Sequence, residues 1–233
     1  MIETKECRTE PGKNGDMPEI KAGEATGTGI WYRLSRVISI LMHPFAMPTY
    51  MVVFMLFSGT VMSYIAPKEK LMFIAIVLLN TAVVPALFIG LMKSAGYLRE
   101  ISLDDPRERI VPLLVTAVCY SVCAYMVPDN YLVFLVRKFL IAGTACIIAA
   151  LIVTWSWKIS LHMIAVGAAF AILLILNVSW QGLGVMLVPL IMLTLLGGML
   201  ASARLMLGAH TPAQVGAGFL LGFAVTCAIV LFS

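Results

Sequence analysis

The chain has 233 residues, of which 61% are hydrophobic and 12% are charged, and its formal net charge is +4. Its mean hydropathy of +0.98 excludes an ordinary soluble domain and predicts an integral membrane protein. The positive surplus suits contact with anionic lipid, and we expect membrane lipid, not nucleic acid, as its surroundings and partner.

The N-terminal segment differs from the rest of the chain. Residues 1–36 hold six basic and six acidic residues, which predicts a disordered tail ahead of a membrane domain at 37–233. From Ile30 to Met42, apolar residues spaced three to four apart predict a short interfacial helix. His43 and Pro44 then interrupt the chain.

Apolar runs of membrane-spanning length recur after this point, since a span needs about 17–25 residues. We expect an all-α, polytopic helical bundle of six to seven transmembrane helices. The predicted spans are 48–65, 71–92, 110–127, 139–157, 162–179, 183–201 and 212–232. An earlier start of the fourth span stays open, and Arg137 and Lys138 then have to extend to the interface.

Three polar segments interrupt the apolar chain, at 99–112, 157–162 and 202–214. Two predicted spans separate each segment from the next, so all three are expected at the same face of the membrane. Together they bring four arginines, a lysine and two histidines to that face. Charges near a bilayer core are costly, and this set therefore predicts a composite polar site.

Each segment also has a structural explanation. Arg107 and Arg109 are ordinary topology-setting charges if taken alone, and His162 alone is a buried, hydrogen-bonded histidine. Ser160 is then the N-cap of the fifth span. Residues 211–214 (Thr-Pro-Ala-Gln) form a capping box with proline at the first helical position.

The ordered segments resemble the three motifs of the type 2 phosphatidic acid phosphatase (PAP2) superfamily. Arg204-x5-His210 is similar to the core of the third motif, and Ser160 with His162 is similar to the second. Arg109, followed by Pro112, resembles the end of the first. The resemblance covers roughly residues 99–232, and the stretch 43–50 (HPFAMPTY) resembles a divergent bacterial branch.

Three positions depart from the family pattern. Ser102 stands where the first motif has lysine, Ala203 where the third has serine, and Gln214 where the third has aspartate. Positions 210 and 214 share one side of a helix. A glutamine oxygen there can orient an imidazole, but it supplies no negative charge.

The resemblance implies hydrolysis of a lipid phosphate or diphosphate without a metal or other cofactor. It makes His210 the nucleophile, His162 the acid and base, and Gln214 the orienting residue, through a phosphohistidine intermediate. The phosphate-binding residues are then Arg109, Arg204, Arg107, Lys158 and Ser160. The substrate stays open among polyprenyl diphosphate, phosphatidylglycerol phosphate and lipid A phosphate.

Two other functions stay open at this stage. One is a PAP2-like protein that has lost catalysis and binds or moves lipid phosphates, which Gln214 favours. The other is an intramembrane prenyltransferase, because 104–108 (DDPRE) resembles an acidic magnesium cluster. The later polar segments hold no second acidic cluster. We expect a bacterial inner membrane location, with the membrane side of the site and the oligomeric state left open.

Overall fold

The computed structural model describes residues 29–59, 61–97, 106–128, 133–179 and 186–232. Within these ranges the chain is helical and contains no strand, which confirms the all-α class. The elements are α1 (Ile30–Leu41), α2 (Met47–Phe57), η1 (Val61–Tyr64), α3 (Pro67–Leu78), η2 (Leu79–Val83), α4 (Val84–Ser94), α5 (Pro106–Met126), α6 (Phe134–Thr154), α7 (Leu161–Ser179), α8 (Leu187–Met206) and α9 (Pro212–Phe232).

Six of the described helical segments are long and apolar enough to cross a membrane, which supports a multi-pass membrane protein. One of them, Pro67–Ser94, combines α3, the π-helical turn η2 and α4 into 28 residues. The other five are α5 from Arg109 onward, α6, α7 up to Val178, α8 and α9.

The predicted first span at 48–65 is wrong as a continuous helix. Helix α2 has only 11 residues, about 17 Å at 1.5 Å per residue, against a hydrocarbon core of about 30 Å. It ends at Ser58, and Gly59 follows with a φ of +74°, a left-handed conformation that favours glycine. The short η1 turn follows.

Two other span boundaries shift. Helix α6 starts at Phe134 and not at 139, so Lys138 lies inside it and donates from Nζ to the carbonyl of Val230 at 3.3 Å. That contact places a positive charge at the negative C-terminal end of α9. Helix α8 runs on to Met206, so Arg204 lies in its last helical turn.

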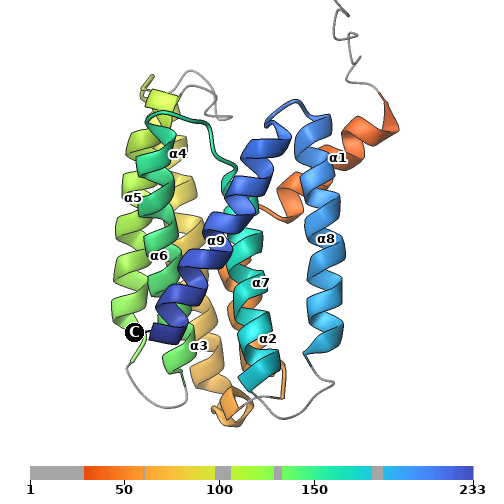
Figure 1. Ribbon diagram of the computed structural model, residues 1–233. Coiled ribbons are helices and arrows are strands. Elements are labelled where there is room, and N and C mark those ends of the chain that lie inside the picture. The colour runs from red at the N-terminus through yellow and green to blue at the C-terminus, as the bar shows by residue number, and fades with distance from the viewer. Residues whose placement is uncertain (1–28, 60, 98–105, 129–132, 180–185, 233) are drawn as a thin grey trace, which may run out of the picture.

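The described parts of the three polar segments lie at one end of the bundle. In Figure 1 the end of α4, the start of α5, the α6–α7 link and the α8–α9 link are at the top. The C-terminus is at the opposite end. The described residues therefore confirm the prediction, made from the number of spans between them, that the three polar segments share one end of the bundle.

Helices α7 and α9 cross at very short range because glycines occupy the contact. A Cβ built on Gly222 lies 2.0 Å from the carbonyl oxygen of Ile164, and one on Gly167 lies 2.1 Å from that of Phe219. Any larger residue pushes the two backbones apart. Small residues at helix crossings are the usual means of close packing in membranes, and here the crossing fixes the start of α7 against the start of α9.

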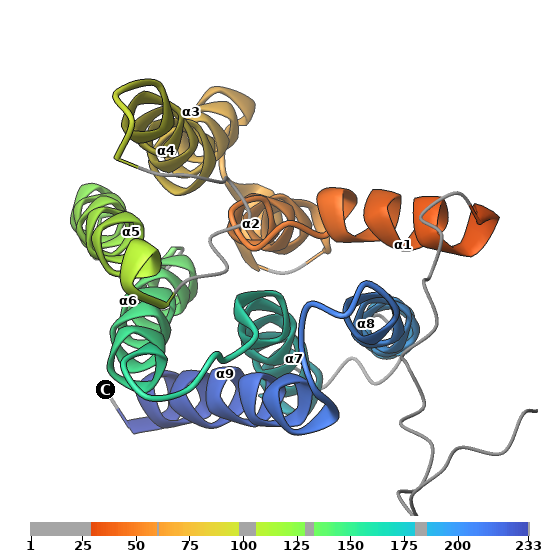
Figure 2. The same ribbon diagram turned by 90° about the horizontal axis from the view of Figure 1, so that it is seen from above.

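Helix α1 lies across the bundle axis beside α8, as Figure 2 shows from above. Its buried residues are Ser35 and Ser39, while Trp31, Leu34 and Val37 are exposed. In a membrane protein, this exposed apolar side suits lipid at the interface. The predicted helix from Ile30 is confirmed, and it includes residues 30–36 of the predicted tail; residues 1–28 lie outside the described residues.

Candidate functional site

A cavity of about 290 Å³, which we call the basic cavity, lies at the end of the bundle where the three polar segments meet. Arg109 enters it from the start of α5, His162 from the start of α7 and Arg204 from the end of α8. His210 enters from the α8–α9 link. The lining that the structure describes holds two arginines, three histidines and no Asp or Glu. This composition suits an anion.

His210 is held by the turn that connects α8 to α9. Gly208, with a φ of +63°, ends α8, and its N–H donates to the carbonyl of Leu205 at 2.9 Å. The left-handed conformation costs a residue with a Cβ about 1–2 kcal/mol. The turn leaves His210 directly before the first turn of α9, where the positive end of the helix dipole favours an anion.

Gln214 orients the His210 ring. The Gln214 Oε1 atom lies 3.2 Å from His210 Nδ1 and accepts the Thr211 N–H at 3.1 Å. Because Thr211 N can only donate, the atom facing both groups is the oxygen, and His210 Nδ1 carries the proton. The Nε2 lone pair of His210 is then available to attack. The Thr211 hydroxyl also accepts the Gln214 N–H at 3.4 Å, which confirms the predicted capping box.

The protonation state of His210 follows from its surroundings. Burial lowers its pKa most, the Arg204 guanidinium lowers it further, and the pKa falls to about 4 despite the opposing bond to Gln214. Arg109 and Lys158 add smaller downward effects. At pH 7 only about one ring in a thousand is protonated, so the ring is in its nucleophilic form.

His162 is fixed through its other ring nitrogen. Its Nε2 lies 3.1 Å from the backbone carbonyl of Ser39 in α1. A carbonyl only accepts, so Nε2 carries the proton and the lone pair of the neutral ring is on Nδ1. Helix α1 therefore sets the orientation of a cavity residue that is 123 positions away in the chain.

The structure adds His43, which was predicted to interrupt the chain and belongs to the stretch 43–50, but was not predicted as a site residue. Its ring centroid lies 5.5 Å from that of His162, and its Nδ1 accepts the Phe45 N–H at 3.3 Å. The proton is therefore on Nε2, as a donor. Thr81, in the π-helical turn, donates its hydroxyl proton to the Val77 carbonyl at 2.8 Å, and the same oxygen lies 3.4 Å from the Phe45 carbonyl. π-Helical turns occur frequently at functional sites.

The remaining predicted residues have different positions. Lys158 is half-buried near enough to affect the pKa of His210, but it does not line the cavity. Ser160 is fully buried beneath α9, and its hydroxyl has no hydrogen-bond partner among the described residues. The backbone of Arg107 is in the first turn of α5, but its side chain lies outside the described residues. The acidic stretch at 104–105 lies outside them as well.

Among the described residues, no group of three or more His, Cys, Asp or Glu side chains is arranged to hold a metal ion. Comparisons with protein-family models, curated proteins and solved structures give no match. The case for a function therefore depends on the chain's own residues.

Proposed function

We propose that the chain is a PAP2-like integral membrane phosphatase of a bacterial inner membrane, acting on a lipid phosphate or diphosphate. One observation carries the proposal: a neutral His210, with its Nδ1 proton held by Gln214, lines a cavity that also contains Arg109 and Arg204. An imidazole lone pair in the same cavity as two guanidinium groups suits attack on a bound phosphate.

In the first step, His210 Nε2 attacks phosphorus. The N–P bond forms while the bond from phosphorus to the leaving oxygen breaks, and this oxygen takes a proton or, in a diphosphate, departs as a phosphate. Arg109 and Arg204 bind the phosphoryl oxygens, because guanidinium forks match their spacing. The His43 Nε2–H is placed to donate to one of the oxygens.

In the second step, water attacks the phosphohistidine. The O–P bond forms, the N–P bond breaks, and inorganic phosphate leaves. His162 takes the proton of the water on Nδ1, the nitrogen whose lone pair remains available when Nε2–H is bonded to Ser39. The same ring returns this proton to an alcohol leaving group in the first step of the next turnover.

One observation favours a second candidate, a protein that binds or moves lipid phosphates without hydrolysing them. Gln214 Oε1 is shared between His210 and the Thr211 N–H, and it carries no charge to stabilise a cationic phosphoimidazolium. In serine proteases, loss of the corresponding negative charge lowers turnover about 10⁴-fold. Binding through the arginines does not require that charge.

The test is phosphate release from lipid phosphates by purified protein in EDTA, compared with His210→Ala. The proposal expects release by the unmodified protein and none by the variant. A matched control is Thr211→Ser, which keeps the hydroxyl that caps α9. Equal release by His210→Ala refutes the nucleophile, and tight binding without release by folded protein supports the second candidate.

A further inference from the structure

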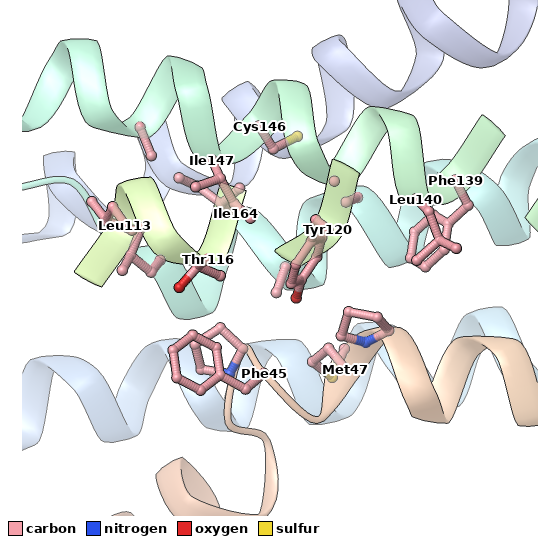
Figure 3. Close-up of a pocket in the computed structure, with 17 residues that line it drawn as sticks. Phe45, Met47, Leu113, Thr116, Tyr120, Phe139, Leu140, Cys146, Ile147 and Ile164 are labelled. Atoms are coloured by element: carbon pink, nitrogen blue, oxygen red, sulfur yellow. The ribbon is translucent and has the colours of Figure 1, made fainter. Parts of the chain in front are cut away.

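A second pocket, of about 70 Å³, lies beside the basic cavity, between α2 and the helices α5, α6 and α7. Figure 3 shows it, with Phe45 and Met47 on one side and Leu113, Tyr120 and Ile147 on the other. The two spaces share part of their walls. The residues that line both are Pro44, Phe45, Leu113, Thr116 and Leu161.

The lining of this second pocket is apolar. The residues found only here are Met47, Pro48, Tyr120, Phe139, Leu140, Gly143, Cys146, Ile147, Ala150, Ile164, Ala165 and Ala168. No charged residue is among them, and the Thr116 hydroxyl already donates to the carbonyl of Pro112 at 2.7 Å. Apart from Thr116, the Tyr120 hydroxyl and the Cys146 thiol are the polar side-chain groups of this lining. Hydrocarbon is therefore the matching ligand chemistry, since a charged group placed there loses its hydration and meets no opposite charge.

We propose that the apolar pocket receives the first carbons of a single hydrocarbon chain attached to the phosphate that occupies the basic cavity. The inference rests on the proposed function for the phosphate and adds the place and number of its chains. Continuity with the basic cavity selects this occupant: an amphiphile with its phosphate at Arg109 and Arg204 has its chain at the shared wall of Phe45, Leu113 and Thr116.

The small size of the pocket gives it selectivity. At about 70 Å³, against about 290 Å³ for the basic cavity, it fits one chain and not the two chains of a diacylglycerol phosphate side by side. A chain that leaves lipid for an apolar pocket gains little hydrophobic free energy. The pocket therefore acts by orienting the scissile phosphate toward His210, and it favours single-chain lipid phosphates.

The test uses a decyl phosphate that carries a diazirine near the phosphate end of its chain. After illumination of the protein in nanodiscs, mass spectrometry identifies the labelled residues. Ala165→Leu fills the pocket from α7, and Ile147→Trp fills it from α6 if the first variant does not fold. Ala224→Leu, at an exposed position of α9, is the matched control. Phosphate release from p-nitrophenyl phosphate, which has no chain, is measured in parallel.

The expected result is labelling of pocket residues of α5, α6 or α7. The labelling is expected to fall about tenfold in Ala165→Leu, which corresponds to binding of the chain weakened by about 1.4 kcal/mol. The labelling stays unchanged in Ala224→Leu. Labelling confined to exposed surfaces, or insensitive to Ala165→Leu and Ile147→Trp, overturns the chain pocket even if p-nitrophenyl phosphate is hydrolysed. Pocket labelling without hydrolysis of any phosphate ester overturns the phosphatase and retains the pocket.

Discussion

Gln214→Glu adds one negative charge at the point that orients the candidate nucleophile. Glutamate has the same length as glutamine, so an oxygen remains 3.2 Å from His210 Nδ1 and 3.1 Å from Thr211 N. The change also suits the local structure, because glutamate is favoured at this position of a capping box and near a helix N-terminus.

The magnitude follows from that distance. An opposite charge within about 4–6 Å shifts a pKa by about 1–3 units. The pKa of His210, now about 4, is therefore expected to rise to between about 5 and 7 in Gln214→Glu. Each unit stabilises the cationic ring by about 1.36 kcal/mol, and the phosphoimidazolium formed by attack is also a cation. Turnover at neutral pH is expected to rise about tenfold or more.

The assay is phosphate release as a function of pH. Activity requires the neutral ring, so it is lost as pH falls through the pKa of His210: near 4 in the unmodified protein and between about 5 and 7 in Gln214→Glu. Gln214→Met, which removes the acceptor, is the control and is expected to lower turnover at every pH. An acid limb that stays in place in Gln214→Glu refutes the assignment of Gln214 as the orienting residue.

The remaining predictions concern packing and the third histidine. Gly222→Ala places a Cβ 2.0 Å from a carbonyl oxygen of α7. We therefore expect a lower melting temperature and at least about 1–3 kcal/mol of destabilisation. The control is Gly216→Ala, which has open space around its Cβ and should keep the normal melting temperature. Gly208→Ala must keep a φ of +63° and is expected to lose about 1–2 kcal/mol and much of its turnover; normal turnover contradicts this role. His43→Asn keeps an acceptor for the Phe45 N–H but loses the Nε2–H donor, so the KM for phosphate esters should rise with an unchanged melting temperature, and an unchanged KM excludes phosphate contact by His43.

Much of the architecture could be predicted from the sequence because long apolar runs leave few alternatives in a membrane. The parity of the runs was enough to bring Arg109, His162 and Arg204 to one end of the bundle. The prediction of a membrane span at 48–65 was wrong because hydropathy alone does not show that the helix ends at Ser58 and Gly59. The end of α8 was misplaced because Arg204 is polar, although a basic residue is favoured in the last turn of a helix.

The site itself was only partly predictable. The His210–Gln214 contact was predicted from helical spacing, and the structure contains it. Its cause is different, because His210 lies before α9 and the capping box turns Gln214 back toward it. The place of His43 in the cavity was not predicted because it depends on two long-range contacts. One is between Thr81 and the Phe45 carbonyl, and the other is between the rings of His43 and His162. Ser160 matched a motif by spacing, yet it lies under α9 because Gly218 allows the backbones to approach there. Sequence spacing does not determine such contacts between distant helices.

The central claim is that His210 carries the phosphoryl group during turnover. The direct measurement is to mix the protein with a radiolabelled lipid phosphate in EDTA, quench in alkali, where a nitrogen–phosphorus bond survives, and map the label by mass spectrometry. The account predicts a phosphohistidine at His210, absent from His210→Ala and longer-lived in His162→Ala, which lacks the base for hydrolysis. Phosphate release with no covalent label at His210, or with the label on another residue, contradicts it.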